Sequence, residues 1–459
     1  MRRVLTALVV ALPALFAPIT PAVAAPTSPP IQHLVVIVEQ NGTYDHVFGD
    51  LPASKNLPHG HRPTEPQINA PPDLRIDPAS RLTPTDFFVD PGETLLNNDA
   101  IAAEAAYHGG KMDGFYEAQH DAKRNPDISF SVIDHNLHPP WRRLAAQGVV
   151  FDRYFSSVLG GSLPNTLNLM AGTSDGIVDS SRSSLKQLWS SDNIQTIFNA
   201  AAGTNDVSWK YYIGGLGGLD QTKLKGGTYI YSKEPIPSQL YWAPILSMES
   251  TWTTAGFSDN IRPQNDFFNA AASGTLPNIT YVVPQPSTHE PLPLSSDLRL
   301  LSMVNALRAS PDWSSTAVLV VWDDWGGYYD HVRPNVRHGQ QLGFRVPMIL
   351  LSPYADAHTI ENRVMDHSSV PQLAASLFHL DGYETGSRTT FPPHLWTDAP
   401  STQEKFTSLS HPGRYEALGM AHSPSVFILY LLTVVMITGV LFVTGVTLRG
   451  APAEGGNRT

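Results

Sequence analysis

The stretch IQHLVVIVEQNGT, Ile31–Thr43, opens with an apolar, β-branched run and ends in polar residues. A run of this kind is typical of a strand that is buried on both faces of a sheet. Further strands are predicted at residues 148–151, 207–213, 279–283, 317–322 and 347–351, and helices at 298–308 and 370–377. Strands that alternate with helices favour an α/β fold with a mostly parallel sheet, in which ligands bind beyond the carboxyl ends of the strands.

The two ends of the chain differ in composition from its middle. Residues 1–25 combine two arginines, an apolar run and a small-residue cleavage pattern, which is typical of a signal peptide. Residues 426–448 carry no charge and are long enough to cross a bilayer as one transmembrane helix. Residues 401–425 then form a stalk, and 449–459, with two arginines, a cytoplasmic tail. We therefore expect an exported single-pass protein of the cell membrane, with one extracytoplasmic domain at 31–400.

Composition restricts the chemistry and the partners of this domain. The 459 residues include no cysteine, so neither a disulfide nor a thiolate ligand or nucleophile is available. The formal net charge is -11 and the body has no run of lysine or arginine, which argues against a nucleic acid as partner. A ligand that carries phosphate would have to be held locally, by a metal ion, rather than by a general basic field.

Two polar pairs directly follow predicted strands. Gln40 and Asn41 follow the first strand, and Asp323 and Asp324 follow the strand that ends at Trp322. Adjacent carboxylates raise each other's pKa unless a cation lies between them. With the amide oxygens, they offer ligands for one divalent metal ion, whose identity the sequence leaves open. The alternative is that the two aspartates only form a turn.

A third polar segment, GGSLPN at Gly160–Asn165, is predicted to begin a helix. Pro164 suits the first helical position, and the glycines allow a close approach of other groups. Ser162 would then lie at the helix N-terminus, where backbone N–H groups and the positive end of the dipole favour phosphate. A serine at this position can equally serve only as a helix cap.

Five segments together resemble the phosphoesterase family that includes phosphatidylcholine-type phospholipases C and an acid phosphatase. They lie at residues 40–49, 109–115, 162–165, 322–332 and 366–370. Their order and spacing hold over residues 31–400, which is far more specific than any one segment. The resemblance implies an alkaline-phosphatase-like α/β/α sandwich.

The resemblance also implies roles for particular residues. It makes Ser162 the nucleophile of the reaction. The metal ligands are then Gln40, Asn41, Asp323 and Asp324. Two histidines, His289 and His331, are predicted to act in catalysis, since a positioned imidazole can protonate a leaving alkoxide or stabilise phosphoryl oxygens. Asn165 and His367 are predicted to contact the substrate.

One position departs from the family pattern. Where relatives have glutamate before asparagine, this chain has Gln40 before Asn41, with Glu39 one place earlier. Gln40 can still bind a metal ion through its amide oxygen, but the site loses one negative charge and should hold its cation less tightly. A shift that brings Glu39 to the metal is the alternative, although neighbouring residues of a strand face opposite ways.

The function predicted from these features is metal-dependent hydrolysis of a phosphoester through a phosphoseryl intermediate. The substrate can be a phospholipid, as for a phospholipase C, or a small phosphomonoester, as for an acid phosphatase. A membrane-anchored binding protein that keeps the fold and has lost turnover is the competing prediction. Ser162, Asp323 and Asp324 favour the enzyme, and Gln40 favours the binding protein.

Overall fold

The computed structural model describes residues 30–48, 96–130, 140–204, 206–284, 294–337, 339–383 and 391–400. The predicted signal peptide, stalk, transmembrane helix and tail lie outside these ranges, as does His289, so they stay predictions. Within the described ranges no helix is both long enough and apolar enough to cross a bilayer.

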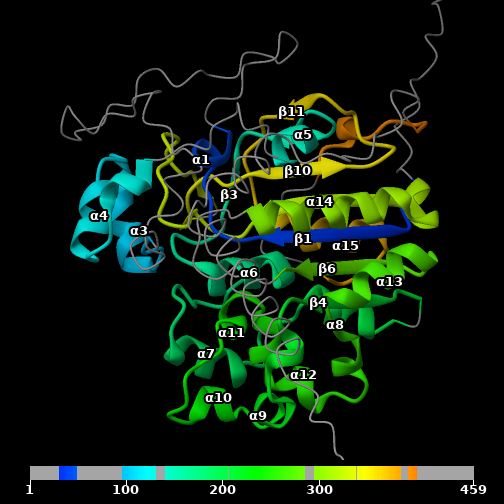
Figure 1. Ribbon diagram of the computed structural model, residues 1–459, viewed down its shortest axis with the longest axis horizontal. Coiled ribbons are helices and arrows are strands. Elements are labelled where there is room, and N and C mark those ends of the chain that lie inside the picture. The colour runs from blue at the N-terminus through cyan, green and yellow to red at the C-terminus, as the bar shows by residue number, and fades with distance from the viewer. Residues whose placement is uncertain are drawn as a thin grey trace, which may run out of the picture.

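An eight-stranded sheet forms the centre of the described structure. Its strands, in spatial order, are β11 (Thr359–Glu361), β2 (Val149–Phe151), β10 (Met348–Leu351), β7 (Thr316–Trp322), β1 (His33–Glu39), β6 (Ile279–Val283), β4 (Trp209–Ile213) and β5 (Ile261–Pro263). Neighbouring strands run parallel except where β10 pairs with β2 and β7. In Figure 1 the arrows of β1 and β10 point in opposite directions. The predicted mostly parallel sheet is confirmed, with one antiparallel strand.

The middle of the sheet is dry because its strands consist of apolar residues. Residues 34–38 of β1 are fully buried, and so is every residue of β7. The two strands pair from His33 opposite Thr316 to Glu39 opposite Trp322. Their carboxyl ends therefore lie side by side, and the polar residues that follow each strand are brought together.

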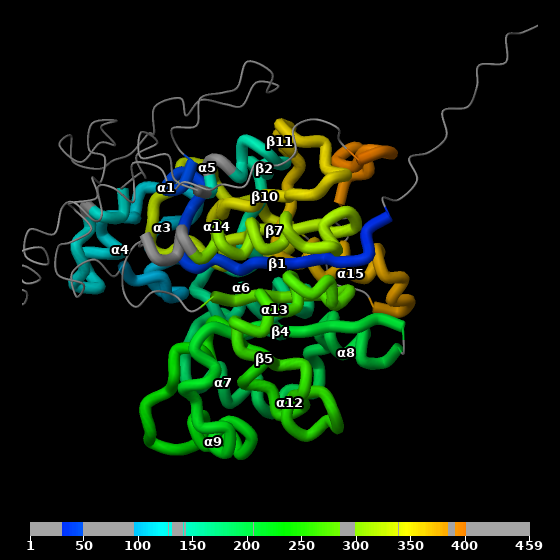
Figure 2. The backbone as a smooth tube through the Cα atoms, turned by 45° about the vertical axis from the view of Figure 1, so that its right-hand side comes forward, coloured from blue at the N-terminus to red at the C-terminus, as the bar shows by residue number. Residues whose placement is uncertain are grey.

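Helices cover both faces of the sheet. One layer contains α5 (Pro140–Ala145), α13 (Asn265–Ser273) and α14 (Leu294–Ala309). The other contains α6 (Ser162–Ala171), α8 (Ile197–Ala202) and α15 (Ser369–Leu377). Figures 1 and 2 both show α14 between the levels of β10 and β1, and in Figure 1 α15 is seen behind β1. The predicted α/β/α sandwich is confirmed.

The remaining elements lie around this sandwich. Beside the carboxyl end of β1 are α1 (Tyr44–Phe48), α3 (Ala100–Tyr107) and α4 (Phe115–Asp121), as Figure 1 shows. Below the sheet in that view are α7 (Arg182–Trp189), α9 (Gln221–Lys225), α10 (Thr228–Tyr231), α11 (Gln239–Trp242) and α12 (Glu249–Thr253). Two small sheets pair β3 (Tyr154–Phe155) with β12 (Met365–Asp366), and β8 (Val336–Arg337) with β9 (Gln340–Gln341).

Candidate active site

The loops that follow β1 and β7 are joined by backbone hydrogen bonds. The amide of Asn41 donates to Oδ1 of Asp323 at 3.0 Å. The amide of Gly42 donates to the carbonyl of Asp324 at 2.8 Å, and that of Asp323 to the carbonyl of Glu39 at 2.9 Å. The two polar pairs found in the sequence therefore meet at the carboxyl edge of the sheet.

The turn after the aspartates also requires glycine. Gly326 has a φ of +64°, and a Cβ added there would lie 2.7 Å from Cβ of Asn41. Its amide donates to Oδ1 of Asp324 at 2.7 Å. Asn41 itself has a φ of 57°, in the left-handed region that asparagine tolerates better than most residues. The aspartates thus do begin a turn, and this turn holds Asn41 against them.

Both aspartates are fully buried, which makes their negative charges costly. Among the described residues, Oδ2 of Asp323 has no hydrogen-bond partner. Burial, together with the charge of Asp324, raises the pKa of Asp323 well above its usual range. Burial also raises the pKa of Asp324 to about 6, against the effect of hydrogen bonds from Asn98, Gly326 and Ser162.

The oxygen atoms of this group are suitable ligands for a hard divalent cation. A buried carboxylate oxygen without a partner and two adjacent carboxyls that disfavour each other's ionisation are the features that a bound cation would relieve. The amide oxygens of Asn41 and Gln40 add neutral oxygen ligands of the kind such ions accept. The residues present therefore suit the predicted metal site.

Ser162 faces this group from the start of α6. Its Oγ donates to Oδ2 of Asp324 at 2.9 Å and lies 3.5 Å from Oε1 of Gln40. The N-cap is Gly161, and Pro164 is the third residue of the helix rather than the first. Proline is tolerated there because first-turn N–H groups have no partner within the helix. The structure therefore brings Ser162 to Asp323 and Asp324, which together form the acid pair of the site.

Gln40 and Glu39 point to different sides of β1. The Nε2 of Gln40 is buried without a partner in the described structure, while its Oε1 faces Ser162. Glu39 is buried, which raises its pKa to about 7, and the nearby charge of Arg299 on α14 opposes that rise. Gln40 is thus the side chain that the strand turns toward the site.

Asn165 is fully buried beneath the loop that precedes Ser162. Its Oδ1 accepts from the amide of Val158 at 2.9 Å. Its Nδ2 donates to the carbonyls of Val158 and Gly160 at 3.1 Å and of Gly161 at 3.0 Å. The predicted substrate contact does not agree with this position, because all its polar atoms hold the loop. Asn165 positions Ser162.

His367 is also fully buried, behind the acid pair. Its Nε2 lies 2.6 Å from the carbonyl oxygen of Asp323, and its Nδ1 lies 3.0 Å from the hydroxyl of Tyr154. Burial lowers the pKa of His367 to about 4, so the ring is neutral at physiological pH. The predicted role as a substrate contact does not fit this burial, and His367 instead supports the backbone of Asp323.

His331 belongs to an ion network next to the acid pair. Its Nδ1 lies 2.6 Å from Oδ2 of Asp45. The guanidinium of Arg345 bonds Asp45 at 2.8 Å and both carboxylate oxygens of Asp330 at 3.1 Å. Burial alone would lower the pKa of His331, but the hydrogen bond and charge of Asp45 raise it. Burial would raise the pKa of Asp45, but Arg345 and His331 lower it.

This network also has the spacing of a cation site. Ligand atoms of Asp45, Asp330 and His331 lie within 4.8 Å of one another. Arg345, which is itself buried, already supplies the positive charge that these carboxylates need. The network therefore joins the loop after β1 to the loop after β7. The catalytic role of His331 stays a prediction.

One contact residue was not identified in the sequence. Nδ2 of Asn98 lies 2.9 Å from Oδ1 of Asn41, and 2.9 and 3.1 Å from the two carboxylate oxygens of Asp324. The signal that was available is the polar run at 97–99 immediately before a helix and shortly before the segment at 109–115 that resembles the family. Such a run reads as a helix cap, which is the role that Asp99 has.

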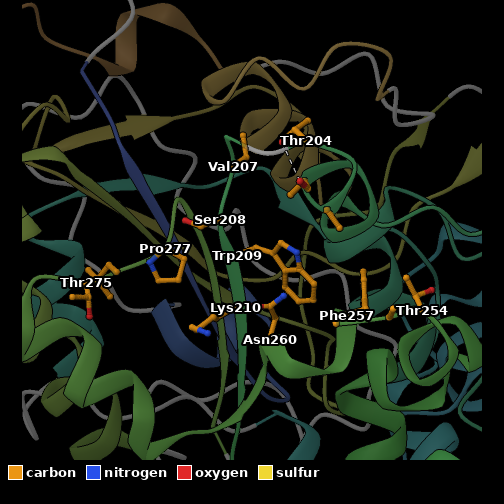
Figure 3. Close-up of a pocket in the computed structure, with 15 residues that line it drawn as sticks. Thr204, Val207, Ser208, Trp209, Lys210, Thr254, Phe257, Asn260, Thr275 and Pro277 are labelled. Carbon is orange, nitrogen blue, oxygen red and sulfur yellow. Dashed lines mark hydrogen bonds between the residues drawn. The ribbon is translucent and has the colours of Figure 1, made fainter.

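A separate cavity lies at the amino ends of the strands, on the side of the sheet opposite the candidate active site. It has a volume of about 550 Å³ and is lined by residues at the amino end of β4, among them Ser208, Trp209 and Lys210, and by Pro277 before β6. Figure 3 shows Trp209 and Phe257 along its wall. Because catalytic groups of α/β sheets lie at the carboxyl edge, this cavity is not part of the candidate active site.

Beyond the carboxyl ends of the parallel strands, a serine at a helix N-terminus is hydrogen-bonded to a buried carboxylate, which is an arrangement suited to nucleophilic catalysis. The chain belongs to the Phosphoesterase family, whose model matches residues 31–381. It is therefore a hydrolase of phosphoric ester bonds. Family membership and the mostly parallel sheet agree with the predicted alkaline-phosphatase-like α/β fold.

Relatives and solved structures resemble the chain at low identity. Non-specific phospholipase C6 of Arabidopsis thaliana is 25% identical over 400 residues, which cover 76% of this chain and 68% of that protein. Phospholipase C A of Mycobacterium tuberculosis is 27% identical over 398 residues, covering 76% and 73%. A solved protein of the alkaline phosphatase superfamily from Vibrio parahaemolyticus is 14% identical, covers 72% of this chain and 79% of that one, and has a TM-score of 0.35.

Proposed function

We propose that this protein hydrolyses phosphoesters with a bound divalent metal ion and a phosphoseryl intermediate on Ser162. The observation that supports this proposal is the hydrogen bond from Oγ of Ser162 to Oδ2 of Asp324, within a buried acid pair. A serine hydroxyl is a weak nucleophile unless a neighbouring base accepts its hydrogen or a cation lowers its pKa. Asp324 is the acceptor here, and a cation at the two aspartates would add the second effect.

The reaction runs in two displacements. Oγ of Ser162 gives its proton to solvent and attacks phosphorus, and the bond from phosphorus to the ester oxygen breaks as the leaving alkoxide takes a proton from His289, the proposed acid. Water then attacks the phosphoserine and gives a proton to His289, phosphate or a phosphomonoester is released, and Oγ takes a proton from solvent. Asp324 orients the hydroxyl before the attack and after the release.

A divalent ion held by Gln40, Asn41, Asp323 and Asp324 would supply positive charge that favours the serine alkoxide and the phosphoryl oxygens. The protein's own residues supply the geometry. Asn165 fixes the loop that leads into Ser162, and His367 fixes the carbonyl of Asp323. The N-terminus of α6 directs its dipole toward the same place.

The substrate that we propose is a phospholipid, cleaved at the outer face of the cell membrane. Two observations support this choice: the similarity to proteins named phospholipases C, and the apolar segment 426–448 that would hold the domain at a bilayer. A small phosphomonoester is the other candidate. The second function, a binding protein without turnover, is favoured only by Gln40 in place of glutamate.

The test is to trap the intermediate. The full chain in detergent is mixed with a phosphate-labelled phospholipid or a phosphomonoester, with and without chelator, and quenched in acid. We expect label on the peptide that contains Ser162 and loss of turnover with chelator. The Ser162→Ala variant should lose at least about 10³-fold in kcat while its circular dichroism is unchanged.

Ser273→Ala on the exposed side of α13 is the matched control, because it removes a serine far from the site. A Ser162→Ala variant with near-normal kcat would remove Ser162 from the mechanism. Absence of hydrolysis of either substrate by the metal-loaded wild type would leave the binding protein as the better account.

A further inference from the structure

Asn98 lies on the loop that leads into α3, and its side chain faces the acid pair. Its Nδ2 is within hydrogen-bond distance of Oδ1 of Asn41 and of both carboxylate oxygens of Asp324. Oδ2 of Asp324 also accepts from Oγ of Ser162. The amide of Asn98 and the hydroxyl of Ser162 therefore meet on one carboxylate oxygen.

The backbone around Asn98 is fixed by contacts that do not involve its side chain. The buried indole of Trp325 donates to the carbonyl of Asn98 at 3.1 Å. The buried amide of Gln119 bonds the backbone of Asn97 twice, at 2.7 and 2.8 Å. Asp99 caps α3 by accepting from the backbone at 2.8 Å. The loop is thus held in place, while the side chain of Asn98 is only partly buried at the site.

This loop lies directly against the residue before Ser162. A Cβ added to Gly161 would lie 3.2 Å from the carbonyl oxygen of Asn98 and 3.7 Å from its Cγ. Asn98 therefore lies next to the start of the helix that carries Ser162.

The contacts of the Asn98 side-chain amide indicate how this group would respond to a cation bound at the site. An asparagine –NH₂ has two hydrogens, yet Nδ2 of Asn98 has three oxygens within reach on Asn41 and Asp324. A cation bound by those oxygens draws electron density from their lone pairs and repels the amide hydrogens, so it weakens these hydrogen bonds. The released donor stays beside Oγ of Ser162, because the backbone of Asn98 is fixed.

We infer that Asn98 binds the substrate by donating an N–H to a non-bridging phosphoryl oxygen, next to the attacking Oγ of Ser162. This inference rests on the proposed function and adds a specific phosphoryl-binding residue to it. A donor aimed at an oxygen that gains negative charge in the reaction stabilises that charge. The competing role is that Asn98 only offsets the charge of Asp324, and then its removal would change metal affinity and leave phosphate affinity as it was.

The experiment measures inorganic phosphate binding by calorimetry in the Ser162→Ala background, in which no turnover occurs. The full chain is loaded with the divalent ion that elemental analysis finds in the wild type. Adding Asn98→Ala should weaken phosphate binding about tenfold or more, the effect of losing one hydrogen bond to a charged group. Affinity for the divalent ion should not fall, because the amide of Asn98 competes with the ion for the oxygens of Asn41 and Asp324.

Asn98→Asp is the second variant, because it keeps the side-chain volume and replaces the N–H donor with a negative charge. Its carboxylate should weaken phosphate binding further and tighten binding of the divalent ion. Asn269→Ala, on an exposed position of α13, is the matched control and should change neither affinity.

Unchanged phosphate affinity in both Asn98 variants would overturn the inference, as would a change in metal affinity alone in Asn98→Ala. These results would leave the proposed function standing. If the metal-loaded Ser162→Ala protein with Asn98 intact binds no phosphate, the phosphoryl site itself is refuted, and the proposed function fails with the inference.

Discussion

At the scale of single residues, the site is determined by how much negative charge is buried in it. Asp323 and Asp324 are fully buried side by side, and Gln40, whose Oε1 lies near Ser162, has an amide where the family pattern that the chain resembles has glutamate. A cation at this place would be held by fewer charges than in a site with glutamate. The same deficit leaves the cation with more pull on phosphoryl oxygens, so a weaker metal site need not be a slower enzyme.

Substituting Gln40→Glu should therefore raise the affinity for the metal ion, and sensitivity to chelator should fall even where kcat is unchanged. Added negative charge also raises the pKa of Ser162, which is the reason that kcat need not increase. Metal affinity is measured by competition with a chromogenic chelator. Gln221→Glu, at the exposed start of α9, adds the same charge elsewhere and is the control.

A lowered melting temperature with unaltered metal affinity would contradict the assignment of Gln40. It would mean that the new carboxylate is buried without a partner, and that Glu39 is the ligand instead. The structure favours Gln40, since Glu39 lies near the charge of Arg299 on α14.

Some site residues could be predicted because the sequence around them has a recognisable pattern, and others could not because their contacts are distant in the sequence. Asp323 and Asp324 follow an unmistakable apolar strand, so their place at the sheet edge was predictable. Asn98 has its contacts 57 and 226 positions away in the chain, and no local pattern encodes them. Asn165 and His367 lie in recognisable segments, but their burial depends on packing that a single segment does not reveal.

At the scale of elements, the central strands were predictable and the edges were not. The runs that became β1, β6 and β7 are long and apolar because both faces of each strand are covered. The edge strands β5 and β11 have three residues each. They are defined by pairing with the neighbouring strand rather than by an apolar run in the sequence. The antiparallel direction of β10 was not predictable, because a buried strand has the same composition in either direction.

The ion network of Asp45, Asp330, His331 and Arg345 joins two of these elements, and its effect on stability should depend on pH. The folded state raises the pKa of His331, so the protonated ring stabilises the fold. This contribution is complete below the unfolded pKa of about 6.5 and is lost as pH rises through the higher folded value. The stability difference between wild type and His331→Gln should be largest below pH 6 and shrink in alkaline solution.

The measurement is urea unfolding of both proteins between pH 5.5 and pH 9, at constant ionic strength. Titration of groups outside the network is common to both proteins and cancels in the difference. His120→Gln, on the exposed surface of α4, corrects for the general effect of removing an imidazole. A difference that grows with pH would show that His331 is held neutral in the folded state.

At the scale of the whole molecule, the sequence predicted the layered arrangement because strands and helices alternate along it. Active sites of such sheets lie beyond the carboxyl ends of the parallel strands. With this rule, the eight-stranded sheet is enough to predict that Ser162 and the aspartates lie together. The order of strands across the sheet was not predictable, since β1 lies between β6 and β7, which are about 240 and 280 positions further along the chain. Pairing over such distances depends on the tertiary fold.

The last prediction concerns how the protein is held at its site of action. Residues 426–448 would span about 34 Å as a helix, enough for the hydrocarbon core of a bilayer. A chain that ends after Pro400 should therefore leave the membrane fraction and become soluble, because it keeps residues 31–381, which match the family, and loses the apolar segment. Its kcat on a soluble phosphoester should equal that of the full chain, while hydrolysis of phospholipid in vesicles should fall.

Removing only residues 449–459 is the control, and it should leave the protein in the membrane fraction after a carbonate wash. A truncated chain that still sediments with membranes would show that another part of the protein binds the bilayer, and that 426–448 is not the anchor.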